Sequence, residues 1–192
     1  MSEVFIREEA GLHLDRANKL LAGLGNFGGN GSAAFHAITS ALNRAAKSAK
    51  SKAGQFASER YVISQSGFKG HVRDKMFVSG GNGGVSGVRL TFAGSVIKLI
   101  EFGTKFSRDG GVAVSVKRGG GGTLSHAFIP ENMRLGIYER ITSSRLPVEE
   151  KYGPSAAHMM MDEGVTEKME KQIVTVFNER IEHEITRILN GW

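Results

Sequence analysis

The sequence predicts an α+β fold in which two helices pack on one antiparallel, twisted sheet of about five or six strands. Apolar residues recur at three- and four-residue spacing over 35–56 and at every fourth residue over 163–189, as they do on one side of a helix. Between these segments, apolar and polar residues alternate in several short runs, as they do in strands. A chain of 192 residues with this order of elements is expected to form a single domain over residues 1–192.

The helix predicted in the first half of the chain is basic. Ser32 is a suitable N-cap residue for it. Its apolar side carries small residues, which implies close packing against another element. The side consists of Phe35, Ile38, Leu42, Ala45, Ala49, Ala53 and Phe56. Arg44, Lys47 and Lys50 lie opposite this side, so the helix has a basic face.

Short alternating runs predict the strands. Residues 76–100 are expected to form a meander of two or three antiparallel strands, because glycines bound each run. Further strands are expected at 112–116, 127–129 and 136–140. Smaller elements are a strand at 4–7 and short helices at 15–21 and 66–75.

The C-terminal helix is predicted from Glu163 to Leu189. A strict four-residue repeat drifts by about 40° per step on a helix with 3.6 residues per turn, so its apolar surface is broad. We expect this helix to cover the sheet and to offer a flank to another subunit. The repeat consists of Val165, Met169, Ile173, Phe177, Ile181, Ile185 and Leu189.

The chain contains 26 glycines, and most occur in clusters. Glycine loses much backbone entropy on folding, so the clusters near 23–31, 80–87 and 119–122 are expected to be mobile loops that become ordered against a neighbour. This composition is typical of an assembly component. The absence of cysteine excludes disulfides and thiolate chemistry and fits assembly in a reducing cytoplasm. No run approaches the roughly 20 apolar residues that span a bilayer, and the acidic start of the chain is unlike a leader peptide.

Charge is unevenly distributed. Residues 44–75 contain eight Lys and Arg against two acidic residues, whereas residues 139–192 contain seven basic against ten acidic residues. Such a chain can stack head to tail on copies of itself, meet an acidic protein or contact nucleic acid. For the basic helix face we therefore keep three interpretations, which are a solvated surface, a contact with an acidic subunit and a surface facing DNA.

Residue patterns that carry catalysis are not found. GLGNFG at 23–28 has the glycine spacing of a dinucleotide loop but lacks the preceding strand and the following acidic residue. The six histidines have no metal-ligand spacing. The adjacent carboxylates Glu149 and Glu150, and Asp162 and Glu163, are expected to be solvated. We therefore expect no enzyme, no cofactor and no metal.

A family resemblance is carried by an ordered set of residues between His126 and Met161. A strand with glycine and an aromatic–charged end (Gly136, Tyr138, Glu139, Arg140) precedes the basic segment Arg145, Leu146 and Pro147, then Tyr152, Gly153, Pro154 and Ser155, and then the methionines from Met159. In this order the chain resembles the minor tail protein Z family of tailed bacteriophages. Prolines restrict the segment, so it is expected to be extended and to contact a sheet of its own or of an adjacent subunit.

The resemblance implies a structural protein that completes the head-proximal end of a phage tail for head-tail joining. By analogy, it would form a homo-oligomeric ring in contact with the terminator, tube and connector proteins, with non-specific contact to passing DNA and no membrane. It would assemble in the host cytoplasm and remain in the tail or neck of the virion. The residues expected to interact are Arg44, Lys47, Lys50, Tyr138, Arg140, Arg145, Leu146, Pro147, Tyr152, Gly153 and Pro154.

Two alternatives remain open. The protein could itself be the tail terminator or a neck adaptor ring, which copurification with tube protein or with connector protein would decide. Alternatively, it could be a basic nucleic-acid-binding protein, whose affinity for duplex DNA would fall steeply with salt.

Overall fold

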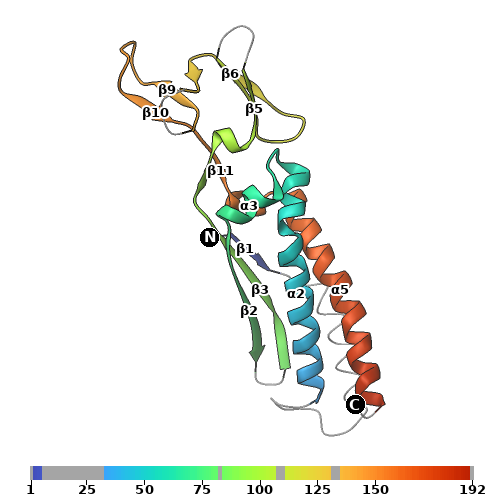
Figure 1. Ribbon diagram of the computed structural model, residues 1–192. Coiled ribbons are helices and arrows are strands. Elements are labelled where there is room, and N and C mark those ends of the chain that lie inside the picture. Colours follow the sequence, from blue (N-terminus) through green and yellow to red (C-terminus); the bar gives the residue numbers. More distant parts are fainter. Residues whose placement is uncertain (1, 6–32, 82–83, 107–110, 131–134, 191–192) are drawn as a thin grey trace. The chain divides into compact units, whose positions relative to one another are not determined.

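The computed structural model describes residues 2–5, 33–81, 84–106, 111–130 and 135–190. Contacts divide the chain into two compact units (Figure 1). Unit 1 comprises Met1–Ala53, Asp74–Phe92 and Thr166–Trp192, and unit 2 comprises Gly54–Arg73 and Ala93–Val165. The predicted N-cap, the helix at 15–21 and the glycine cluster at 23–31 lie outside the described residues.

Both long helices are confirmed. Helix α2 spans Ala33–Arg60 and helix α5 spans Glu163–Leu189. The predicted apolar sides are buried from Ile38 to Phe56 in α2 and from Val165 to Ile181 in α5. From Ala37 on, the alanines of α2 are almost fully covered, which permits the close packing expected from the sequence.

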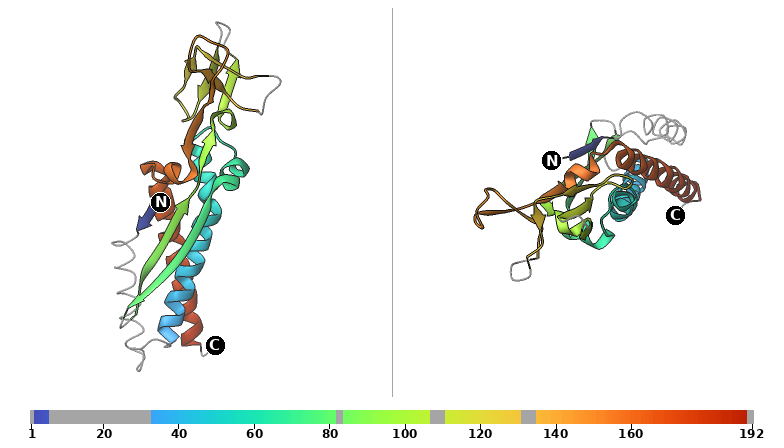
Figure 2. Two further views of the ribbon diagram at one scale, coloured as in Figure 1. Left: turned by 90° about the vertical axis from the view of Figure 1, so that its left-hand side faces the viewer. Right: turned by 90° about the horizontal axis from the view of Figure 1, so that it is seen from above.

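Unit 1 combines the first part of α2 and most of α5 with a small sheet. The sheet has the order β1–β3–β2, formed by β1 (Ser2–Phe5), β3 (Gly84–Ala93) and β2 (Arg73–Gly81). Helix α2 contacts α5 on one side through a hydrogen bond, in which Lys52 Nζ lies 2.9 Å from Gln172 Oε1. On the other side it contacts β2 through an ion pair, in which Lys50 Nζ lies 2.6 Å from Asp74 Oδ2. Within unit 1, α2 therefore lies between α5 and the sheet (Figures 1 and 2).

The prediction of one sheet of five or six strands is wrong, although the α+β class and the antiparallel pairing are confirmed. The described strands form four small sheets. In particular, β4 (Val96–Lys98) does not continue the predicted meander but pairs with β11 (Tyr152–Ser155), far along the chain. Alternation identifies a strand but not its partner, and strands this short gain little from any particular neighbour.

Unit 2 holds the other sheets. One has the order β5–β6–β7, with β5 (Gly103–Phe106), β6 (Val112–Ser115) and β7 (Gly122–Leu124). Another has the order β10–β9–β8, with β8 (Ala127–Phe128), β9 (Tyr138–Arg140) and β10 (Val148–Glu150). The unit also contains helix α3 (Gln65–His71), the 3-10 helix η1 (Leu99–Glu101) and helix α4 (Ala156–Met160). Helix α3 ends earlier than the predicted helix at 66–75, because β2 begins at Arg73.

The glycine clusters differ in structure. Strand β2 ends at Gly81 and strand β3 begins at Gly84, so most of the loop predicted at 80–87 belongs to these strands. Residues 119–121 lie in the turn between β6 and β7, where the Gly120 N–H donates to the Lys117 carbonyl at 3.1 Å, and Gly122 begins β7. Gly119 has φ +79°, a conformation that favours glycine. Among the described helices, none combines the length and apolar character needed to cross a bilayer.

Candidate functional site

The segment on which the family resemblance rests forms a β-hairpin followed by a third strand. Strands β9 and β10 pair antiparallel, with Arg140 opposite Val148 and Tyr138 opposite Glu150. Beyond this ladder, the Ile141 N–H donates to the Pro147 carbonyl at 3.3 Å. Residues 141–147 therefore form the tip of the hairpin, and all of them are exposed.

Tyr138 and Arg140 support the hairpin from the side of β8. Tyr138 lies opposite Phe128, with the two ring centroids 6.4 Å apart, and only 8% of Tyr138 is exposed. The Arg140 guanidinium lies 5.0 Å from the centroid of the Phe128 ring, a cation–π distance. Tyr138 was predicted as an interaction residue, but its burial makes it part of the core of unit 2.

A polar network fixes the base of the hairpin. Lys98 Nζ lies 2.5 Å from Glu150 Oε1 and 3.3 Å from the Leu135 carbonyl oxygen. The Tyr152 hydroxyl donates to Glu150 Oε2 at 2.7 Å. A Cβ on Gly136 would lie 2.4 Å from Glu150 Oε1, so the network closes only because residue 136 has no side chain. The prediction that Glu150 is solvated is therefore wrong.

Strand β11 explains the remaining motif residues. Tyr152 lies opposite Lys98 in the β4 ladder. A Cβ on Gly153 would lie 2.5 Å from Cε2 of Phe102, which is itself buried. The Ser155 hydroxyl accepts a hydrogen bond from the His158 N–H at 3.1 Å and caps α4. The predicted extended segment thus pairs with β9 and β4 of its own chain.

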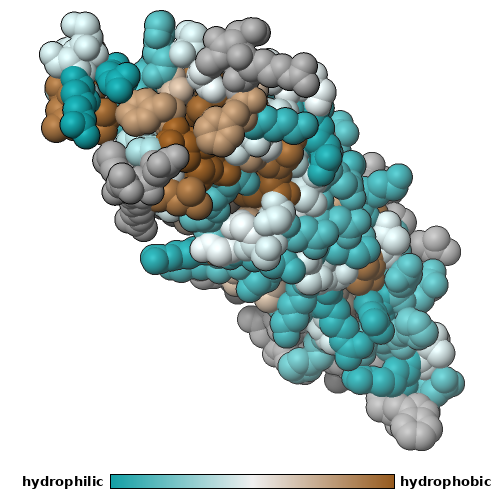
Figure 3. Space-filling model, turned by 45° about the horizontal axis from the view of Figure 1, so that its top comes forward, coloured by the Kyte–Doolittle hydropathy of each residue, from teal (hydrophilic) through white to brown (hydrophobic). Residues whose placement is uncertain are grey.

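Exposed apolar side chains are concentrated in unit 2. Large apolar residues with high exposure among the described residues are Val96, Phe106, Leu135, Ile141, Leu146, Tyr152 and Met161, all of which belong to that unit. On the face drawn in Figure 3, brown side chains gather in one area, whereas much of the remaining surface is hydrophilic. Contiguous exposed apolar surface is typical of an interaction site. The sequence prediction included Leu146 and Tyr152 but missed Ile141 and Phe106, each of which ends an alternating run.

The tip of the hairpin combines apolar and basic character. Ile141 is 63% exposed and Leu146 is 67% exposed, and the exposed Arg145 stands next to Leu146. Pro147 closes the tip through its carbonyl bond to Ile141. The hairpin therefore combines a fixed base with a tip that exposes two large apolar side chains and one cation.

The basic face of α2 belongs to unit 1, not to the unit that carries the hairpin. Arg44 Nη2 lies 3.9 Å from Glu184 Oε1, and Lys50 is paired with Asp74. Lys47 is exposed. Two of the three predicted contact residues are therefore paired with acidic groups of their own chain.

The structure reveals a charge cluster that the sequence analysis missed. Asp162 was predicted to be solvated, but only 8% of its side chain is exposed. Its Oδ2 lies 2.7 Å from Lys117 Nζ and 3.2 Å from the Tyr61 hydroxyl, and its Oδ1 lies 3.3 Å from Arg60 Nε. The hydrogen bond from Lys117 is the main cause that lowers the pKa of Asp162. Burial, and then the charge of Asp162, raises the pKa of Tyr61.

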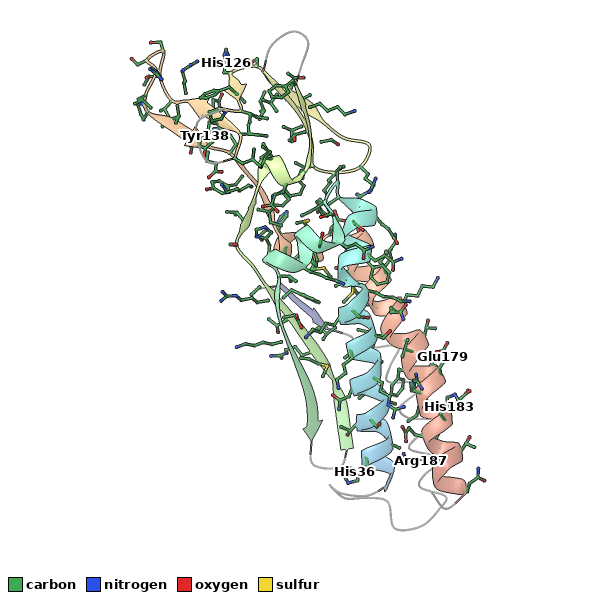
Figure 4. The ribbon with its side chains drawn as sticks, in the orientation of Figure 1. His36, His126, Tyr138, Glu179, His183 and Arg187 are labelled. Atoms are coloured by element: carbon green, nitrogen blue, oxygen red, sulfur yellow. The ribbon has the colours of Figure 1, made fainter. Side chains whose placement is uncertain are left out.

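A metal-binding arrangement is not found in the part of the chain that the structure describes. Within it, no group of three or more His, Cys, Asp or Glu side chains could hold a metal ion. Glu179, His183 and Arg187 follow one another along α5, and all three are exposed (Figure 4). His183 therefore lies on an exposed side of α5.

Comparison with known proteins finds no relative. None of the protein-family models, curated protein sequences or solved structures compared with the chain matches it.

Proposed function

We propose that this chain is a structural, non-enzymatic subunit of a bacteriophage tail that completes the head-proximal end for head-tail joining. In this proposal, copies form a ring that contacts terminator, tube and connector proteins, first in the host cytoplasm and then in the virion. The supporting observation is the β9–β10 hairpin, whose motif residues fix its base while Ile141 and Leu146 stay exposed at its tip. Apolar side chains held in this way are suited to a protein partner.

The ion pairs of α2 and the composition of the hairpin tip favour a protein partner over nucleic acid. Binding to DNA relies on cations that are available to phosphates. On the basic face of α2, Arg44 and Lys50 already have acidic partners. The tip of the hairpin adds Arg145 as a cation but is otherwise apolar or neutral.

Removal of the gene from its phage or prophage tests the proposal. We expect filled heads and unjoined tails by electron microscopy, and we expect added purified protein to restore infectious particles. Undiminished yields of infectious particles without the protein would refute the function. Copurification with tube protein alone or with connector protein alone would distinguish a terminator from a neck adaptor.

Point variants test the role of the hairpin. The double substitution Leu146→Ala with Tyr152→Ala should abolish head joining while tails remain visible, because it removes two exposed side chains and the hydroxyl bond from Tyr152 to Glu150. Met161→Ala is the matched control, since Met161 is also exposed (64%) but lies outside the segment from Arg145 to Pro154. Equal yields from the double variant and the control would show that the segment is only a spacer.

A further inference from the structure

Strands β10 and β5 are edge strands of two different sheets in unit 2. The sheets are ordered β10–β9–β8 and β5–β6–β7. Strands β7 and β8 follow each other in the chain with only residues 125–126 between them. Strands β7 and β8, which carry this connection, are one edge of each sheet, and β10 and β5 are the other edges. Among the described strands, β10 pairs only with β9 and β5 only with β6.

The two edges carry opposite charges. Glu149, in the middle of β10, has 60% of its side chain exposed. Lys105 in β5 is also exposed. Glu149 lies 2.9 Å from Lys151, but Lys151 lies equally close to Glu139. Glu149 can therefore turn to a new cation while Lys151 keeps a carboxylate partner.

Apolar side chains adjoin the same edges. Phe106, which follows Lys105, is 74% exposed, and Leu146, which precedes β10, is 67% exposed. The sheet of β5 also has a groove of about 470 Å³, lined in part by Gly103, Lys105 and Ala113. The groove lies beside Lys105 and Ala113, whereas Val62 already occupies the space next to Gly103.

We propose that strand β10 of one copy pairs antiparallel with strand β5 of a second copy, with Glu149 opposite Lys105. This register puts Val148 opposite Phe106 and brings Leu146 close to the same ring, so the contact covers exposed apolar surface. The inference rests on the proposed function, in which copies form a ring, and it identifies the strands that join them.

Charge selects this pairing over the alternatives. Pairing of β5 with β5 would oppose two Lys105 side chains, and pairing of β10 with β10 would oppose two Glu149 side chains. Of these three contacts, only the one between β10 and β5 brings opposite charges together. Because this contact is head to tail, each copy uses one edge to bind the preceding copy and the other to bind the next. Repetition gives a ring when the rotation closes.

Single cysteines test the contact directly, because the chain has no cysteine of its own. Residues directly opposite each other in an antiparallel pair have Cα atoms about 4.5–5.5 Å apart, which suits a disulfide. Purified Lys105→Cys and Glu149→Cys proteins, carrying tags of different size, are mixed with oxidised glutathione. We expect a mixed two-chain product, and little product when either variant is incubated alone. An uncrosslinked mixture, or equal crosslinking of either variant alone, would overturn the proposal.

A charge exchange provides a second test. Lys105→Glu should weaken self-association, measured by sedimentation, at least about tenfold, because it opposes like charges. Adding Glu149→Lys in the same chain should restore association. Lys69→Glu, the same charge change at an exposed position of α3, should have no effect. The register would be overturned if Glu149→Lys did not restore the self-association that Lys105→Glu weakens. It would also be overturned if Lys69→Glu weakened self-association equally.

These results are separable from the proposed function. Mixed crosslinks in purified protein, together with normal head joining after gene removal, would keep the strand contact and reject the tail function. Loss of head joining after gene removal, without mixed crosslinks, would reject the contact and keep the function.

Discussion

Replacement of Asp162 by asparagine should lower the free energy of unfolding by about 1–2 kcal/mol at pH 7. The carboxylate has polar contacts with Lys117, Tyr61 and Arg60 at 2.7–3.3 Å and is largely covered. Hydrogen bonds to a charged group contribute about 1.5–3 kcal/mol, whereas exposed ion pairs contribute less than about 1. Lys117 and Arg60 are about half exposed, so water can solvate their charges when the carboxylate is removed. The expected loss of stability therefore lies between these two limits.

The effect should depend on pH with a defined sign. Lys117 lowers the pKa of Asp162 in the folded chain. A carboxylate with a lowered pKa stabilises the fold above its unfolded value, about 3.9, and this contribution is lost as pH falls through the folded pKa. The stability difference between the wild type and Asp162→Asn should therefore be complete at pH 7 and should shrink below about pH 4.

Urea unfolding followed by circular dichroism at pH 7 and at acid pH measures both quantities. Glu163→Gln is the matched control, because it removes the same charge from the exposed neighbouring residue. A loss at pH 7 no larger than that of the control, or a difference that persists in full at acid pH, would refute the assigned ion pairs.

Two further pairs of substitutions probe packing and charge. Gly153→Ala should lower the free energy of unfolding by about 1–3 kcal/mol through overpacking against Phe102. Gly70→Ala is the control and should not lower it, because a Cβ there meets nothing within 4 Å. Thermal unfolding measures both variants, and equal midpoints would contradict the close contact between Gly153 and Phe102. Lys50→Glu should destabilise the fold by up to about 1 kcal/mol because it faces Asp74, whereas Lys47→Glu should leave the fold intact. Counts of joined particles and of DNA released on infection then test Lys47 alone: fewer joined particles indicate an acidic protein partner, impaired release indicates DNA, and normal values for both indicate a solvated surface.

The helices could be predicted from the sequence because the physical cause of their burial is local. Ile38 and Leu42, or Met169 and Ile173, share a helix face by spacing alone. The sheets could not be predicted in the same way. Pairing of Tyr152 with Lys98 joins residues far apart in the chain, and no local pattern in either strand identifies the other.

The candidate site shows the same division. The motif identified the hairpin segment, but it did not distinguish residues that build the hairpin from residues that it exposes. Tyr138 has the composition of a contact residue and is buried against Phe128. Asp162 reads as a surface carboxylate beside Glu163, and only the fold brings Lys117 to it.

The division of the hairpin into a base and a tip has a consequence for its evolution. Gly136 and Gly153 leave no space for a side chain at the base, so substitutions there disturb packing whatever the partner is. Residues 141–147 are exposed, and two hydrogen bonds hold them: the Ile141–Pro147 backbone bond and the bond that the Ser144 N–H donates to the Thr142 hydroxyl. If the hairpin contacts a partner as proposed, the tip can therefore change together with the partner surface while the base stays the same. Exchanging the seven tip residues between related proteins would then change which partner is bound, without a change of fold.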